Sequence, residues 1–234
     1  MKRLVLALAV CYPLLVHAAV VTRNAALTAV CLGWLVLLVL LPPLARGNPI
    51  AWAAAAAAGA AVALILRGSW MWLPLYAPSA LADFFIAWVF GHTLARGRVP
   101  LIERLVRLLH AADEPVDPAV VPYARRLTLC WTLLLTLLGL VNVLLAVCAV
   151  PDGILELLGH APPLSIPQRA WSLYANFLEY LIVGGFFVAE YAYRRHRFPQ
   201  QPFASFADFA RRLLAVAPDA LGARGRSSGM QGQA

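Results

Sequence analysis

Long runs of consecutive apolar residues, separated by short polar stretches, dominate the hydropathy pattern of the chain. A helix that crosses a bilayer needs about 17–25 mainly apolar residues, whereas a strand of a membrane barrel needs about 9–11 residues of alternating polarity. Because these runs are long and do not alternate, they predict helices. We predict six membrane-spanning helices, over residues 4–21, 25–45, 50–66, 70–90, 127–150 and 171–193.

Two shorter stretches combine an apolar face with a polar face, which is typical of helices in the membrane interface. The first follows Pro100 in the loop 91–126, which we place in the cytoplasm. Its polar side holds Glu103 and Arg107, in the order that favours an i, i+4 ion pair. A turn-rich connection that includes Pro122 follows this helix.

The second amphipathic stretch lies around residues 205–213, within a cytoplasmic tail over residues 201–234. After about residue 221 the tail consists mainly of Gly, Ser, Gln and Arg, and we expect it to be disordered. The predicted fold is therefore all-α: a single polytopic transmembrane domain over residues 1–200, with two short amphipathic interfacial helices.

The composition supports this class. Of 234 residues, 62% are hydrophobic and 13% are charged, whereas soluble domains average about 45–50% apolar and about 25% charged residues. These values argue against a soluble globular protein, a disordered chain and a disulfide-rich secreted domain.

The distribution of positive charge predicts the orientation of the helices. The chain carries 19 Lys and Arg against 11 Asp and Glu, a formal net charge of +8. If the N-terminus is cytoplasmic, only Arg23, Arg67 and Arg169 fall in external loops. Since cytoplasmic loops of membrane proteins are enriched in Lys and Arg, we predict a bacterial inner-membrane protein with both termini in the cytoplasm.

The first apolar segment has a second interpretation. Lys2 and Arg3, the apolar run and the sequence Val16-His17-Ala18 also resemble a signal peptide with a small-residue cleavage site. Cleavage would leave five spanning helices and would not change the orientation of the others.

Polar residues inside the predicted spans are candidates for function, because ionisable groups are costly within a membrane. Glu179 and Asn142 lie eight residues from the same membrane face, so a hydrogen bond between them is geometrically possible, and Asn176 is one helical turn away. Asp83 lies nearer the cytoplasm. These four residues form either a polar site or proton path, or interhelical hydrogen bonds that fix packing. Glu190 is better explained by an ion pair with Arg194.

No catalytic constellation, metal site or cofactor motif is recognisable. The four cysteines all fall in predicted spans, without a nearby histidine or a C-x-x-C spacing. Nucleophile-elbow, phosphate-binding and dinucleotide-binding motifs are also missing from the sequence. We therefore predict no catalytic residue, no metal ligand and no cofactor.

The predicted cytoplasmic side carries a basic face. Positive charge there orients the protein and attracts anionic lipid, and it also suits an acidic protein partner. Nucleic acid is not expected as a partner, because no aromatic and basic interleaved fold is present. The face consists of Arg96, Arg98, Arg104, Arg107, Arg125, Arg126, Arg194, Arg195 and Arg197.

Four stretches together carry a family resemblance: residues 90–104, 123–131, 171–180 and 190–199. In order and spacing they resemble small bacterial inner-membrane proteins encoded with aryl-polyene or xanthomonadin-type pigment synthesis genes. Such proteins are sometimes labelled ketosynthases, but the cysteine with two histidines, or with a histidine and an asparagine, that a ketosynthase uses is not recognisable in this chain.

The resemblance implies a membrane accessory to pigment synthesis, without catalysis of its own, whose basic face docks an acidic acyl carrier protein or another pigment-synthesis protein. Two alternatives stay open. One is a small transporter or flippase for a lipid-like product that uses Asp83 and Glu179. The other is a membrane enzyme that acts on the acyl chain.

Overall fold

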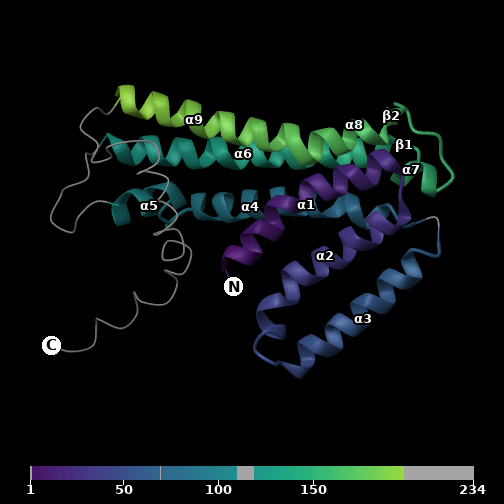
Figure 1. Ribbon diagram of the computed structural model, residues 1–234. Coiled ribbons are helices and arrows are strands. Elements are labelled where there is room, and N and C mark those ends of the chain that lie inside the picture. Colours follow the sequence, from purple (N-terminus) through teal and green to yellow (C-terminus); the bar gives the residue numbers. More distant parts are fainter. Residues whose placement is uncertain (1, 69, 110–118, 198–234) are drawn as a thin grey trace. The chain divides into compact units, whose positions relative to one another are not determined.

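The computed structural model describes residues 2–68, 70–109 and 119–197, and these are mostly helical, as the sequence predicts (Figure 1). The predicted interfacial helix near residues 205–213 and the predicted disorder after about residue 221 lie outside the described residues. The chain forms two compact units, which are described separately below. Unit 1 comprises Met1–Ala82 and Leu138–Gly184, and unit 2 comprises Asp83–Leu137 and Gly185–Ala234.

Three long helices contribute to both units: α4 (Leu73–Gly91), α6 (Val120–Cys148) and α9 (Glu179–Arg197). The other elements of unit 1 are helices α1 (Lys2–Thr22), α2 (Ala25–Leu44), α3 (Pro49–Ile65), α7 (Ile154–Leu157) and α8 (Gln168–Leu173), strands β1 (Ala149–Val150) and β2 (Ile166–Pro167), and the π-helical turn η2 (Tyr174–Leu178). Unit 2 adds the 3₁₀ turn η1 (His92–Leu94) and helix α5 (Leu101–Leu109).

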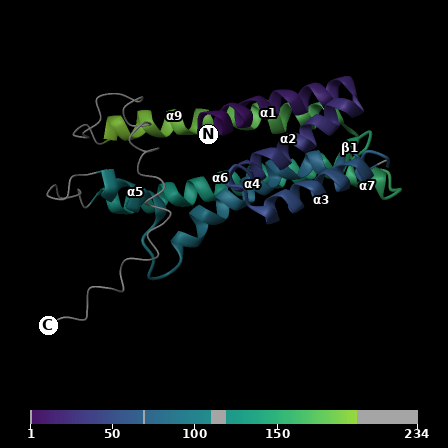
Figure 2. The same cartoon turned by 60° about the horizontal axis from the view of Figure 1, so that its bottom comes forward.

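Short capped turns join the first three helices. The Asn24 side chain accepts hydrogen bonds from the amides of Ala26 and Leu27, and Asn48 caps α3 in the same way, with Pro49 in the first turn. These residue types favour helix starts because they satisfy amides that have no partner within the helix. The short turns make α1, α2 and α3 successive hairpins, and both views show them as neighbours (Figures 1 and 2).

The core of unit 1 lies where α1, α2, α4, α6 and α8 meet. Trp72 and Trp171 are almost completely buried there, together with Tyr76 and Cys31. The loop after α6 closes over this core through the parallel pair β1–β2. It turns at Gly153, where a Cβ would collide with the backbone of Ala149.

In unit 2, helix α5 is fixed at its first turn by two threonines. The Thr93 hydroxyl of η1 accepts a hydrogen bond from the Leu101 amide at 3.0 Å, and the Thr128 hydroxyl of α6 accepts one from the Ile102 amide at 3.4 Å. Both amides lie at the helix start and lack a partner within the helix. The predicted amphipathic helix is thus present over Leu101–Leu109 and is anchored to α6.

Two expectations for the loop 91–126 need correction. The ion pair between Glu103 and Arg107 is present, at 2.6 Å, but Glu103 is buried, with 7% of its surface exposed, and does not lie on a solvated face. Pro122 does not end a turn-rich connection, because α6 begins at Val120. Proline is tolerated in a first helical turn, since its missing N–H has no helical acceptor there.

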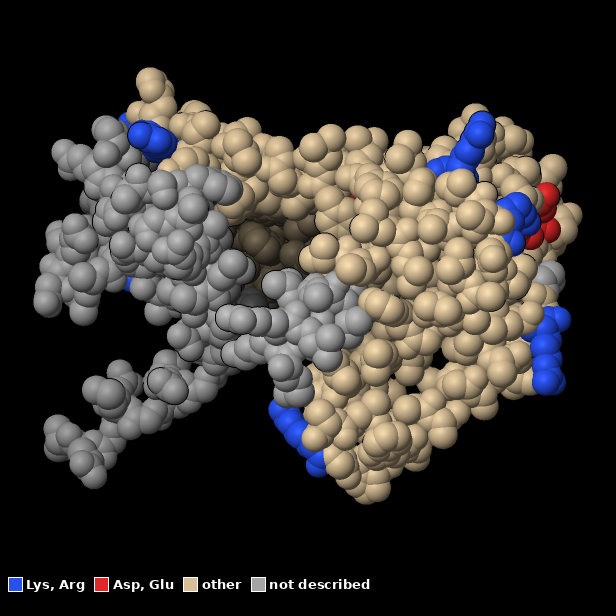
Figure 3. Space-filling model, in the orientation of Figure 1, with Lys and Arg blue, Asp and Glu red and all other residues tan. Residues whose placement is uncertain are grey.

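Each of the six predicted apolar segments coincides with a helix. Among the described residues, four helical stretches are long and apolar enough to cross a membrane: Ala25–Leu44, Leu73–Leu94, Val120–Cys148 and Gln168–Arg197. The apolar helices Val10–Thr22 and Pro49–Ile65 are shorter. In the space-filling view, the visible surface of α1–α3 is almost entirely uncharged, which fits contact with lipid (Figure 3).

Candidate functional site

A buried amide–carboxyl pair lies in unit 1 between α6 and α9. Asn142 Nδ2 donates a hydrogen bond of 2.6 Å to Glu179 Oε2, which is the contact that their equal depth makes possible. Asn142 is fully buried, and Glu179 has only 7% of its surface exposed. From α4, the Ser79 hydroxyl donates to Asn142 Oδ1 at 3.4 Å. Three helices therefore converge on one polar group within an apolar region.

The turn before Glu179 is π-helical. Over Tyr174–Leu178 the helix widens, and the Glu179 amide donates to the Tyr174 carbonyl oxygen, five residues earlier. Single π turns inside α-helices occur frequently at functional sites. Asn176 lies in this turn, but its hydrogen bonds go to the carbonyl and hydroxyl oxygens of Ser172, at 2.8 and 3.2 Å.

Further polar residues continue from Glu179 towards the start of α8. Gln168, Ser172, Asn176 and Glu179 are spaced by four, four and three residues, which favours a single helix face, and all four are buried. We call these four residues the polar stripe. Ser172 lies 3.1 Å from His17 Nδ1 of α1, so the stripe also contacts the first helix.

The start of the stripe is linked to a charged cluster in the loop after α6. Gln168 Nε2 donates to the Tyr76 hydroxyl at 3.0 Å, and that hydroxyl donates to the Asp152 carbonyl oxygen at 3.3 Å. The Asp152 carboxylate pairs with Arg23 at 2.6 Å, and about half of the Arg23 side chain is exposed. No sequence pattern indicates Tyr76 or Asp152 as partners, because their proximity depends on how the loop folds.

Asp83, the other carboxyl predicted in a span, belongs to unit 2. It is also buried, with 3% of its surface exposed. Asp83 lies in α4 and is the first residue of unit 2, so it is described with that unit.

A second buried cluster, in unit 2, joins α6 and α9. Arg194 Nε lies 3.2 Å from Glu190 Oε1, as the sequence predicts, and the Tyr123 hydroxyl donates to the same oxygen at 2.9 Å. Tyr123 also stacks on Tyr193. Only 8% of the Arg194 side chain and 6% of the Glu190 side chain are exposed, so the pair is part of the interior and not a surface ion pair.

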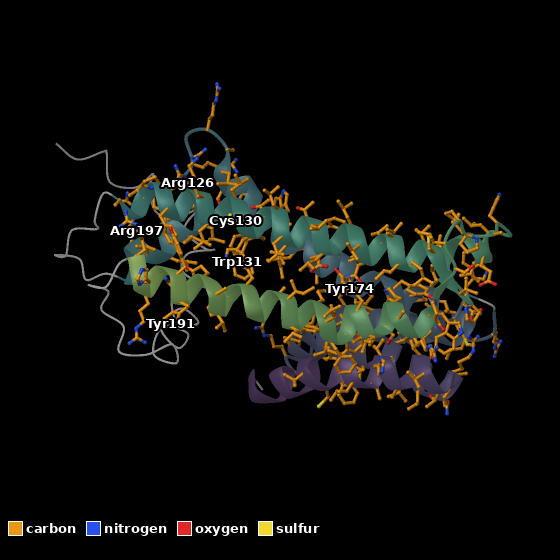
Figure 4. All side chains as sticks on the ribbon, turned by 90° about the horizontal axis from the view of Figure 1, so that it is seen from above. Arg126, Cys130, Trp131, Tyr174, Tyr191 and Arg197 are labelled. Atoms are coloured by element: carbon orange, nitrogen blue, oxygen red, sulfur yellow. The ribbon has the colours of Figure 1, made fainter. Side chains whose placement is uncertain are left out.

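All nine residues of the predicted basic face belong to unit 2. Seven are exposed, Arg104 is half-buried and Arg194 is buried. Arg98 and Arg125 donate to the carbonyl oxygens of His92 and Leu94 and so brace the turn after α4. Arg126 and Arg197 lie at the same end of the α6–α9 pair of this unit (Figure 4). The exposed residues are Arg96, Arg98, Arg107, Arg125, Arg126, Arg195 and Arg197.

The acidic residues of unit 2 are distributed differently. Within the part of this unit that the structure describes, the acidic residues are Asp83, Glu103 and Glu190, and all three are buried. The exposed formal charge on the described part of the unit is therefore positive throughout. Such a one-sided surface attracts anionic partners and raises their association rates. We call the seven exposed arginines together with Arg104 the basic surface.

The cysteines form no cluster with other candidate ligands. Cys31 and Cys148 are buried, and Cys11 and Cys130 are exposed. In the ranges that the structure describes, no group of three His, Cys, Asp or Glu side chains is arranged to hold a metal ion.

Comparison of the chain with protein-family models, with curated proteins and with solved structures finds no match in any of the three.

Proposed function

We propose that the chain is a multi-pass protein of the bacterial inner membrane with six spanning helices and both termini in the cytoplasm. Four helices have the length and hydropathy to span. The 17 residues of α3 extend about 25 Å at about 1.5 Å per residue, which reaches the lower end of the range for spanning helices. The asymmetry of Lys and Arg between alternate loops supports the orientation.

Within that membrane, we propose that the protein is an accessory of aryl-polyene or xanthomonadin-like pigment synthesis that docks an acidic acyl carrier protein, without catalysis of its own. The observation that carries the proposal is the one-sided charge of unit 2, whose described acidic residues are buried while seven arginines are exposed. Acyl carrier proteins of such systems are acidic, so their charge complements this surface.

Some arginines of the basic surface are available for a partner and others have structural tasks. Arg98, Arg107 and Arg125 make hydrogen bonds within the unit. Within the described residues, the side chains of Arg96, Arg104, Arg126 and Arg195 make no ion pair or hydrogen bond. These four are the residues through which we expect a partner to bind.

Binding of the carrier protein tests this proposal directly. The full-length protein is reconstituted in nanodiscs of uncharged lipid, and binding of the purified acyl carrier protein is measured at low ionic strength. Uncharged lipid keeps the arginines from being occupied by lipid headgroups. We expect saturable binding that weakens as salt is added. If the carrier protein does not bind, while anionic vesicles bind, the basic surface serves the membrane alone.

The buried Asn142–Glu179 pair supports a second candidate function, transport of a lipid-like product. Ionisable residues inside membrane-spanning helices often mark substrate or proton pathways, and single π turns occur frequently at functional sites; Glu179 combines both features. The pair also explains helix packing, so the two roles must be separated by experiment.

For transport, the double replacement Asp83→Asn and Glu179→Gln is expected to leave the protein folded, because both amides retain hydrogen bonding. Pigment should then accumulate in the inner membrane and be lost from the outer membrane, as measured by fractionation of the membranes. Normal pigment in the outer membrane of the double variant would exclude this candidate.

A further inference from the structure

We propose that the polar stripe of unit 1 is a proton path that connects the loop cluster at Asp152 with the carboxyl of Glu179. Gln168, Ser172, Asn176 and Glu179 extend over about 16 Å along the α8–η2–α9 helix, at about 1.5 Å per residue. The inference deepens the transport candidate, since it names the proton as the ion that Glu179 exchanges.

Hydroxyl, imidazole and carboxyl groups along the path can pass protons, whereas the amides of Gln168 and Asn176 donate hydrogen bonds to Tyr76 and Ser172 and hold these hydroxyls in place. Hydroxyls donate and accept at the same time, and Tyr76 and Ser172 supply two of them. An imidazole can take up a proton at one ring nitrogen and release one from the other, and His17 Nδ1 lies 3.1 Å from the Ser172 hydroxyl. Glu179 at the inner end of the stripe is a proton acceptor. A stripe that served packing alone would not require a histidine beside Ser172 and a carboxyl at Glu179.

The outer end of the path is open to water. Arg23 and Asp152 form their ion pair with 47% and 23% of their side chains exposed, and Tyr76 bonds the same residue, Asp152. Trp171 packs edge-on against Tyr76, and its buried Nε1–H has no acceptor among the described residues. Buried polar groups are usually hydrogen-bonded, so this donor next to Tyr76 is a position that an internal water molecule would satisfy.

Among the described residues, no side-chain hydrogen bond joins Gln168 to Ser172, and none joins Asn176 to Glu179 across the π turn. Asn176 bonds back to Ser172, and Glu179 bonds across to Asn142. A π turn interrupts the i, i+4 backbone pattern, and functional sites use it frequently. We assign to this turn the step in which a proton passes from the Ser172 side to Glu179. Tyr174, a further titratable group, lies in the π turn itself, and its hydroxyl donates to the Leu138 carbonyl oxygen at 3.4 Å. Tyr12, Cys31 and Tyr180 are other titratable groups of unit 1.

Hydrogen–deuterium exchange of the Glu179 carboxyl tests the path without any transport. The purified full chain, in a detergent without carbonyl groups, is transferred into D₂O while infrared spectra are recorded. For each protein, we subtract the spectrum of the same protein with Glu179→Gln added, and the difference isolates the band of the Glu179 carboxyl. In the parent protein we expect a protonated-carboxyl band that shifts rapidly. Because a positioned proton-transferring group contributes about 100-fold or more to such a step, His17→Phe and Ser172→Ala should slow the shift by that factor.

Matched variants separate a path from a packing role. His17→Asn keeps a hydrogen-bonding side chain that cannot carry a proton. This variant should therefore also slow exchange while it retains thermal stability. Its result decides the question if Ser172→Ala does not fold. Thr28→Ala removes a buried hydroxyl of unit 1 that bonds the nearby Asn24 carbonyl oxygen and is not part of the path, so it should leave the rate unchanged. Equal rates in all variants, or the absence of a band that depends on Glu179, would overturn the path. If the exchange results are as expected but cells with Glu179→Gln export pigment normally, the transport candidate is rejected and the proton path is retained.

Discussion

Replacement of Arg194 by leucine is expected to lower the free energy of unfolding by about 3–5 kcal/mol, because it leaves the buried Glu190 carboxylate without its cation. Tyr123 still donates one hydrogen bond to Glu190, but a neutral donor does not replace a charged one. The loss should be visible in unfolding of the full chain by SDS in mixed micelles, followed by circular dichroism.

The neighbouring arginine provides the matched control. Arg195→Leu removes the same charge from an exposed position, and it should change stability by less than about 1 kcal/mol. The double variant Glu190→Leu and Arg194→Leu should recover much of the loss, since it removes the buried charge together with its partner. Equal losses for Arg194→Leu and Arg195→Leu would contradict the interior position of the pair.

The sequence was sufficient for contacts that depend on helix geometry alone. The Asn142–Glu179 bond follows from the constant rise of two antiparallel helices, and the Glu190–Arg194 and Glu103–Arg107 pairs follow from the i, i+4 spacing. These contacts are set by distance along a helix axis, which can be counted in residues.

Contacts that depend on the rotation of a helix or on loop folding were missed. Glu103 has the spacing of a polar face but is turned into unit 2, because threonines of η1 and α6 fix the start of α5. The contact of Tyr123 with Glu190 is not predicted, because Tyr123 precedes the apolar run. In the structure α6 begins three residues before Tyr123, and this places its hydroxyl beside Glu190.

The π turn could not be predicted either, and it changes how the candidate site is understood. A regular α-helix places Asn176 one turn from Glu179, which is why the sequence groups them. In the widened turn the Asn176 amide bonds back to Ser172 of the preceding turn. The structure thus adds Ser172 and His17 to the candidate site, because their contact depends on how α1 packs against α8.

The largest functional effect is expected from reversal of charge on the basic surface. Arg96→Glu combined with Arg126→Glu changes two exposed arginines whose side chains make no ion pair or hydrogen bond within the described residues. Electrostatic steering accelerates association by about 10- to 1000-fold, so reversal at two positions should slow carrier-protein association by about 100-fold at low ionic strength. Stopped-flow fluorescence with labelled carrier protein and nanodiscs of uncharged lipid measures this rate.

Two arginines of unit 1 supply a control with the same change in net charge. Arg67→Glu combined with Arg169→Glu alters exposed residues that the proposed topology places on the external side, so it should have little effect on the association rate. The difference between the two double variants should decrease as salt rises, since the Debye length falls from about 10 Å at 0.1 M to about 3 Å at 1 M. If both double variants slow association equally, net charge attracts the carrier protein and the basic surface is not its docking site. If only the unit 2 variant does so, the partner binds where the buried acidic residues leave the arginines unopposed.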